Sequence, residues 1–290
     1  MTLHNAARIN NLQLCKELVS QGIDVNQFNN NMFTPLLIAT IKSNIEIVKF
    51  LITTGADVNL FYHEPAIALA AEIGNLEMVK FFHQHGAKTN LGPYSLSWIA
   101  SLNGHSQVLE FLLSLGDNAN TIYKEISPLY VAIYNGHLDC VKILLQYGAD
   151  INFQRVNLVN IVEVVIAKKQ YEIMKYFLDN ELIDINVILP KKTRKITLLI
   201  SAVIVGDIEM IELLLKYGAK VNFTTGEYGK SDFIFPPLYY ACYYGYLALI
   251  KLFIENGADV NYEVDNRTLF DRFPTENVRK LLLSKMLHYT

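Results

Sequence analysis

One five-residue motif recurs along the whole chain, and its spacing limits the folds that are available. Its clearest copies read Gly-Ala-Asp-Val-Asn, at 55–59 and 257–261. Six related copies end at Asn26, Asn90, Asn120, Asn152, Asn186 and Asn222. Successive motif asparagines are 30 to 39 residues apart. Units of that size are too small to bury a core of their own, so the sequence predicts an array in which neighbouring units stack on one another.

Each copy of the motif is followed by the signals of a helix pair. Thr34-Pro35-Leu36 and Ser127-Pro128-Leu129 each place a capping hydroxyl before a proline suited to the first helical turn. A break such as Gly136-His137 separates this first helix from a second one. Apolar residues three and four apart predict the second helix, in one copy Leu138, Val141, Leu144 and Leu145. The motif glycine ends it, because glycine adopts the left-handed conformation without steric cost.

This order of helices, turn and Thr-Pro-Leu start resembles the ankyrin repeat, and the resemblance covers nearly the whole chain. It implies an all-α ankyrin-repeat solenoid of about nine helix-turn-helix units with projecting β-turn fingers. First helices would line a concave face and second helices a convex back. We expect a single array over 1–290, with units at 2–26, 34–59, 65–90, 95–120, 127–152, 160–186, 197–222 and 236–261 and a C-terminal cap at 267–288.

The sixth unit and two turns depart from the pattern. In the sixth unit, Lys169 replaces the glycine between the helices and Leu182 replaces the glycine that ends the second helix. We therefore expect this unit to be a local weak point. The fingers at 187–196 and 223–235 are longer than the others. Two interpretations stay open for them, tolerated surface insertions or sites of partner contact.

Composition and charge exclude several classes of protein. Hydrophobic residues make up 51% of the chain, which excludes a disordered chain. The net charge of −3 gives no reason to expect nucleic acid or an anionic membrane as a partner. We expect a cytoplasmic monomer, or one in a host cytosol if the chain is a secreted effector. The basic string Lys191–Lys195 resembles a short nuclear-import signal, and a solvated loop explains it more simply.

No residue pattern points to catalysis, a metal or a cofactor. Cys15, Cys140 and Cys242 fall on apolar helix positions and are expected to be buried. His83 and His85 have no second ligand pair at suitable spacing. The recurring aspartates are expected to bond the local backbone of their turns. We therefore predict a protein that is not an enzyme and holds no cofactor or metal.

Aromatic and apolar residues are concentrated where ankyrin arrays contact their partners. These positions lie late in the first helices, before the motif glycine, and in the fingers. The predicted partner-binding residues are Phe28, Phe33, Ile41, Phe61, Tyr62, Ile73, Leu102, Tyr123, Tyr134, Tyr147, Tyr217, Tyr228, Tyr243 and Tyr244. Two other interpretations stay open. Rings such as Trp98, Tyr130 and Tyr239 could pack between units, and the finger with Phe233 and Phe235 could fold over Tyr243 and Tyr244.

The resemblance implies a protein-interaction role. We predict a non-enzymatic scaffold that binds another protein or a peptide through its concave face and fingers, as an effector or regulator. The alternative is a substrate-recruiting adaptor of a larger enzyme complex, such as a ubiquitin ligase. A faint resemblance of Phe273–Leu283 to the start of an F-box supports that alternative, although a capping helix explains the same residues.

Overall fold

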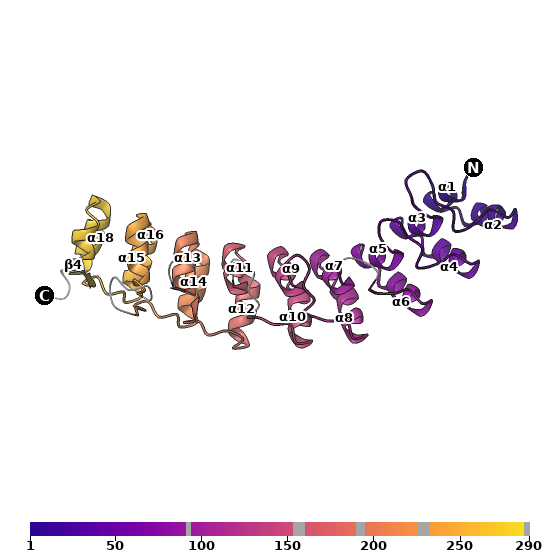
Figure 1. The fold of residues 1–290 in the computed structure, drawn as a ribbon. Coiled ribbons are helices and arrows are strands. Elements are labelled where there is room, and N and C mark those ends of the chain that lie inside the picture. The colour runs from indigo at the N-terminus through magenta and orange to yellow at the C-terminus, as the bar shows by residue number, and fades with distance from the viewer. Residues whose placement is uncertain (91–93, 153–159, 190–194, 226–232, 287–290) are drawn as a thin grey trace. The chain divides into compact units, whose positions relative to one another are not determined.

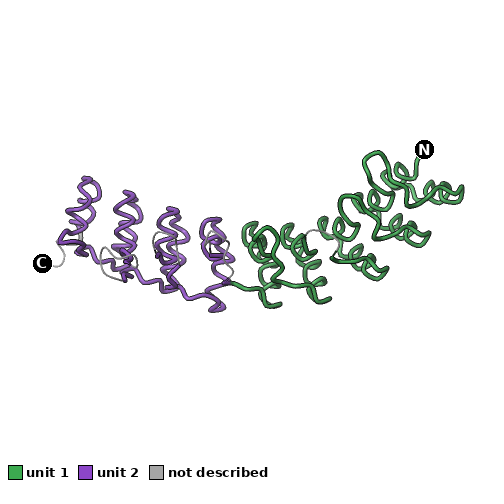
Figure 2. The backbone as a smooth tube through the Cα atoms, in the orientation of Figure 1, with its two compact units in different colours: residues 1–151 green, residues 152–290 purple. Residues whose placement is uncertain are grey.

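The computed structural model describes residues 1–90, 94–152, 160–189, 195–225 and 233–286. Within these ranges it has eighteen helices and four two-residue strands, and each sheet holds only two strands. The all-α repeat prediction is confirmed. The chain divides into two compact units, Met1–Ile151 and Asn152–Thr290 (Figure 2), which are described separately. That all the repeats form a single array stays a prediction.

Unit 1 consists of five helix pairs that follow one another in chain order (Figure 1). The first helices of the pairs are α1 Leu3–Arg8, α3 Pro35–Ile41, α5 Ala66–Glu72, α7 Leu96–Asn103 and α9 Pro128–Asn135. The second helices are α2 Leu12–Ser20, α4 Ile45–Thr53, α6 Leu76–Gln84, α8 Ser106–Ser114 and α10 Leu138–Gln146.

Unit 2 consists of three further helix pairs and a C-terminal pair. Its first helices are α11 Ile161–Ala167, α13 Leu198–Val205, α15 Pro237–Tyr244 and the short α17 Leu269–Arg272. Its second helices are α12 Tyr171–Asp179, α14 Ile208–Lys216, α16 Leu247–Glu255 and α18 Glu276–Met286. The strands are β1 Ile188–Leu189, β2 Ile196–Thr197, β3 Glu263–Val264 and β4 Arg267–Thr268.

Within each unit the first helices pack side by side in one row, which in unit 2 comprises α11, α13 and α15. In unit 1, α1, α3, α5, α7 and α9 each contact the next member of the row. Fully buried alanines such as Ala7, Ala70 and Ala100 allow this close approach, because a methyl group leaves room for the neighbouring backbone. Large apolar side chains of the second helices, among them Phe82 and Phe253, fill the core behind the row.

The predicted helix starts form as expected. Thr34 is the N-cap of α3, and its hydroxyl accepts the backbone N–H of Leu37 at 3.2 Å. Ser127 caps α9 in the same way, through the N–H of Tyr130 at 3.1 Å. A side-chain oxygen at this position satisfies an N–H group that would otherwise have no partner.

The motif aspartates bond their own turns, and the motif asparagines join neighbouring repeats. The Asp57 carboxylate accepts the N–H of Asn59 at 2.9 Å, as predicted. The Asn59 amide then reaches the next turn: Nδ2 donates to Gly86 O at 3.0 Å and Oδ1 accepts the N–H of Lys88 at 2.9 Å. We call this pair of bonds the asparagine clasp. It recurs at Asn26, Asn120 and Asn222.

Asn90 does not form the clasp with any described residue of the turn that begins at Gly116. The physical reason lies in Asp117, which replaces the motif alanine. One carboxylate oxygen of Asp117 accepts the N–H of Asn118, the group that would face Asn90, at 2.9 Å. The other oxygen accepts both the N–H and the hydroxyl of Ser97 in α7, at 3.1 and 2.7 Å. This turn is therefore held to its own helix pair.

The clasp predicts that two asparagines of the same motif contribute differently to the free energy of unfolding. Replacing Asn120 by alanine removes two hydrogen bonds and should lower the free energy of unfolding by about 1–2 kcal/mol. Replacing Asn90 by alanine removes no clasp and should change it by no more than ~0.5 kcal/mol. Urea unfolding followed by circular dichroism measures both. Equal losses would contradict a stabilising role for the clasp.

The sixth repeat shows one correction to the sequence alignment. Lys169 takes the left-handed conformation between the helices, with φ of 55°, as its alignment with glycine implies. At the end of α12, however, Glu181 and not Leu182 is left-handed, with φ of 52°. The N–H of Glu181 bonds Leu178 O, just as the N–H of Gly148 bonds Leu145 O in the preceding repeat. Counting back from Asn186 missed one extra residue in this turn.

The inner ends of the two long fingers are ordered by short strand pairing. Ile188 pairs with Thr197, and Leu189 with Ile196, in an antiparallel ladder. In the second finger an isolated bridge joins Thr225 and Ile234. The tips at 190–194 and 226–232 lie outside the described residues, and with them most of the basic string and Tyr228.

Candidate partner-binding surface

The late positions of the first helices in unit 1 form a row of exposed apolar side chains. The four residues lie at the C-terminal ends of α3, α5, α7 and α9, at the same or adjacent positions of the repeat. They are Ile41, Ile73, Leu102 and Tyr134. Between 37% and 45% of each side chain is exposed to solvent. We call these four residues the unit 1 stripe. Because successive first helices are in contact, the stripe runs across four repeats.

Unit 2 carries a second group of this kind. Its exposed residues are Ile204 and Val205 at the end of α13 and Tyr243 and Tyr244 at the end of α15. Tyr243 is 65% exposed. Phe235 stacks on Tyr239, with ring centroids 3.9 Å apart. The finger that carries Phe235 therefore packs on the first turn of α15, and Tyr243 and Tyr244 stay open to solvent. We call these four exposed residues the unit 2 stripe.

Some aromatic side chains pack between repeats, which is one of the interpretations that the sequence left open. Tyr130 is buried, whereas Trp98 and Tyr239 are half-buried. Tyr123, in the finger before α9, joins a three-ring cluster with Tyr94 and Trp98. Its ring centroid is 5.1 Å from that of Tyr94 and 5.4 Å from that of Trp98. This cluster orders the join between the fourth and fifth repeats.

Four predicted aromatic residues lie in the first two fingers of unit 1. Phe28 and Tyr62 are exposed, and Phe33 and Phe61 are half-buried. The ring of His63 lies 4.9 Å from that of Tyr62 and 5.9 Å from that of Phe33. The two fingers therefore contact each other through aromatic side chains.

Tyr147 and Tyr217 belong to the other helix row. They are the C-caps of the second helices α10 and α14, so the structure does not bring them into the stripes. The Tyr217 hydroxyl donates to the Asp179 carboxylate at the end of α12. This bond and partial burial raise the pKa of Tyr217. Tyr217 therefore links two second helices.

His105 and His137, which lie between first and second helices, bond the C-terminal ends of first helices, where the stripe residues lie. The ring Nε2 of His105 donates to the carbonyl of Glu72 in the preceding repeat at 2.8 Å, and that of His137 to the carbonyl of Leu102 at 3.1 Å. A backbone carbonyl at a helix C-terminus otherwise lacks a partner. The sequence placed His137 at the break between two helices, but it did not show which carbonyl the ring bonds.

The cysteines have the character of buried apolar residues. Cys15, Cys140 and Cys242 are free thiols and are all buried. Burial raises the pKa of Cys15, and raises those of Cys140 and Cys242 to about 12. These thiols stay protonated near neutral pH. Reactive cysteines have the opposite environment, one that favours the thiolate.

The described ranges hold neither a candidate metal site nor a candidate membrane span. No group of three or more His, Cys, Asp or Glu side chains is placed to hold a metal ion there. No helix in the same part of the chain is both long and apolar enough to cross a bilayer.

Comparisons with known proteins agree with the repeat architecture. The family model "Ankyrin repeats (3 copies)" matches residues 1–62, 64–155 and 162–264. The chain belongs to the ankyrin-repeat family. The ankyrin repeat domain of Bcl-3 has the same fold, with a TM-score of 0.61 and 22% identity, over 75% of this chain and 97% of that domain.

Curated relatives are distant and much longer. Palmitoyltransferase AKR1 of Lachancea kluyveri is 29% identical over 203 residues, which are 66% of this chain and 26% of that protein. Ankyrin repeat and SOCS box protein 14 of Mus musculus is 28% identical over 138 residues, 43% of this chain and 22% of that protein. The matched region thus spans about a quarter or less of either relative.

Proposed function

We propose that this ankyrin-repeat chain is a non-enzymatic scaffold that binds another protein or a peptide through its first-helix face. The exposed stripes carry the proposal. Monomeric proteins seldom leave contiguous apolar side chains in water, and those that persist mark binding sites. The tyrosines in the stripes suit this use, since they offer a large contact area and a polar tip. The fingers with Phe28 and Tyr62 extend the same surface.

The observations favour this scaffold over the adaptor of a ubiquitin ligase. The segment that resembles an F-box start is engaged within unit 2. Its Phe273 ring lies 5.2 Å from that of Tyr239, and α18 packs on α16 with Val278 and Leu282 buried. These residues act as the cap of the helix rows. A scaffold in the cytosol, either of the producing cell or of a host, is the setting that we propose.

Two stripe tyrosines provide the test. Replacing Tyr134 and Tyr243 by alanine should change the free energy of unfolding by no more than ~0.5 kcal/mol, because the two side chains are 45% and 65% exposed. Removing interface anchors costs ~2 kcal/mol or more of binding, about thirtyfold in affinity. Partner proteins captured by the immobilised wild-type chain and identified by mass spectrometry should therefore be lost by this variant, and thermal melting should be unchanged.

A matched control carries Glu110→Ala and Lys251→Ala, exposed changes on the second helices α8 and α16. It should capture the same proteins as the wild-type chain. A sharp fall in the melting temperature of the tyrosine variant would show that the two rings are core residues. Undiminished capture by a stable tyrosine variant would place the contacts outside the stripes. Recovery of stable ligase subunits would favour the adaptor.

A further inference from the structure

Two pockets open at the same position of the repeat, two repeats apart, on the first-helix row of unit 1. One lies between α1 and α3 and has a volume of about 230 Å³. The other lies between α5 and α7 and has a volume of about 290 Å³. Several lining residues occupy equivalent positions of the repeat: Arg8 matches Glu72, Ile41 matches Leu102, and Phe33 matches Tyr94. The repeat architecture thus builds one pocket twice.

The charges of the two pockets are opposite. Arg8 and Lys42 line the pocket between α1 and α3, which holds no carboxylate and which we call the basic pocket. Glu64 and Glu72 line the pocket between α5 and α7, which holds no Lys or Arg and which we call the acidic pocket. Stripe residues lie in both walls, Ile41 in the basic pocket and Leu102 in the acidic one.

The acidic pocket is suited to a cationic side chain. The Tyr94 hydroxyl donates to Glu64 Oε1 at 2.7 Å, whereas Glu64 Oε2 is buried without a hydrogen-bond partner. Partial burial, the bond to Glu64 and the negative charges of Glu64 and Glu72 raise the pKa of Tyr94 to about 12. Trp98 and Tyr94 add aromatic walls, and aromatic rings attract guanidinium and ammonium groups.

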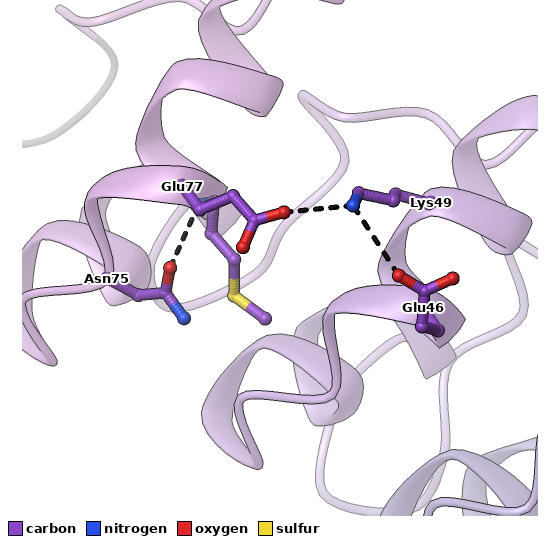
Figure 3. A network of polar contacts seen from close by, with 5 residues as sticks. Glu46, Lys49, Asn75 and Glu77 are labelled. Atoms are coloured by element: carbon purple, nitrogen blue, oxygen red, sulfur yellow. Dashed lines mark hydrogen bonds and ion pairs between the residues drawn. The ribbon is translucent and has the colours of Figure 1, made fainter.

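None of these four charged groups has a counter-ion among the described residues. In the described part of unit 1, every ion pair joins residues of second helices. Figure 3 shows one such network, in which Lys49 lies between Glu46 at 3.5 Å and Glu77 at 2.9 Å. Neither Arg8 nor Lys42 forms an ion pair with a described residue, and neither do Glu64 and Glu72. The second helices neutralise part of their charge internally, whereas the two pockets present theirs outward.

We propose that unit 1 binds an extended peptide segment that carries an acidic residue for the basic pocket and an arginine or lysine for the acidic pocket. This rests on the proposed binding function and names the chemistry of the partner. Apolar residues between the two charges contact the stripe at Ile41, Ile73 and Leu102. Neighbouring packed helices lie ~8–10 Å apart, so two repeats separate the pockets by about 16–20 Å. An extended chain rises ~3.3 Å per residue, so the two charged residues are about five or six positions apart.

A panel of fluorescein-labelled synthetic peptides tests the proposal on the full chain. Each peptide carries one glutamate and one arginine in a leucine- and serine-containing background, at spacings from two to nine positions and in both orders. Matched peptides carry two glutamates or two arginines. We expect peptides with opposite charges five or six positions apart to bind at least tenfold more tightly, by fluorescence anisotropy, than the like-charged peptides. The difference should shrink at high salt, because the pockets are open to water.

A charge-exchanged variant provides the decisive comparison. This variant reverses the signs of the two pockets through Arg8→Glu, Lys42→Glu, Glu64→Gln and Glu72→Lys. The new glutamine can still accept a hydrogen bond from the Tyr94 hydroxyl. Whichever peptide order the wild-type chain prefers, this variant should prefer the other. The control exchanges the second-helix pair of Figure 3, through Lys49→Glu and Glu77→Lys, and should keep the wild-type order.

A second variant tests the proposal even if the charge-exchanged chain fails to fold. Arg8→Gln with Lys42→Gln should weaken the opposite-charge peptides at least tenfold and should not weaken the two-arginine peptides, because it removes only positive charge from the basic pocket. Equal binding of all peptides, no binding of any, or an order preference that survives the charge exchange would overturn the proposal. If the peptide proposal is overturned in this way, loss of partner capture in the Tyr134 and Tyr243 variant would still support the proposed scaffold function. Failure of the peptide proposal and failure of the scaffold function can therefore be told apart.

Discussion

Replacing Gly74 by alanine is expected to lower the free energy of unfolding by about 2–3 kcal/mol. Gly74 has a φ of 76°, and a left-handed conformation costs a non-glycine residue ~1–2 kcal/mol. A Cβ atom there would also lie 2.4 Å from the His105 ring. The ring would have to move and would lose its bond to Glu72 O, worth ~1 kcal/mol. Urea unfolding followed by circular dichroism measures the loss.

Two comparisons separate the backbone cost from the steric cost. Gly148 has a φ of 78°, but a Cβ atom there would meet nothing within 4 Å. Gly148→Ala should therefore cost only about 1 kcal/mol. Adding His105→Ala to Gly74→Ala should cost less than the sum of the two single changes, because the clash disappears. Additive losses, or equal losses at Gly74 and Gly148, would show that the ring does not constrain this glycine.

Replacing Asp207 by alanine is expected to lower the stability of unit 2 by about 3 kcal/mol. Asp207 is 3% exposed and is the N-cap of α14, where Oδ1 accepts the N–H of Met210 at 3.3 Å. The hydroxyl of Tyr171 donates to its two oxygens at 3.0–3.1 Å. Losing a cap costs ~1 kcal/mol, and leaving the half-buried Tyr171 hydroxyl without its acceptor costs ~1–2 kcal/mol, the lower part of the range for buried donors. Lys169 lies 3.9 Å away but is 57% exposed, so its ion pair adds little.

The tyrosine provides the control for this prediction. Tyr171→Phe should cost about 1 kcal/mol alone and should reduce the further cost of Asp207→Ala, because no donor is then left without a partner. Burial and the bond to Asp207 raise the pKa of Tyr171 to about 12. A raised pKa stabilises the fold below the ordinary value of about 10, so this contribution should fade as the pH rises from about 10 through 12. An unchanged loss in the Tyr171→Phe background would show that the pair is not coupled.

The repeat architecture could be predicted from the sequence because its determinants are local. The Thr34 and Ser127 caps, the left-handed glycines and the aspartate turns each depend on residues within four positions of one another. The prediction that the sixth repeat is weak used the same local signals and stays a prediction. The bond from Tyr171 to Asp207 could not be foreseen, because it joins two repeats and no local signal relates the two residues.

The surface was predictable in part for the same reason. Positions late in the first helices are set by the repeat, and Ile41, Ile73, Leu102, Tyr134, Tyr243 and Tyr244 are exposed there. The bond from Tyr217 to Asp179, 38 positions earlier, could not be foreseen because it joins two repeats, and partner contact by Tyr217 stays a prediction. The two pockets were missed because each is formed by two repeats and a finger together. Aligning charges as well as apolar residues, Arg8 with Glu72, would have pointed to them.

The asparagine clasp also bears on how such a chain can change length during evolution. Each clasp uses a carbonyl and an N–H that nearly every motif turn presents. Removing residues 27–59 would bring Asn26 against the turn at Gly86, which offers the same groups that Asn59 now bonds. Whole repeats can therefore be duplicated or deleted without new side chains at the join. The join after Asn90 is different, since Asp117 holds its turn to Ser97 within the same repeat and no clasp joins the described residues there.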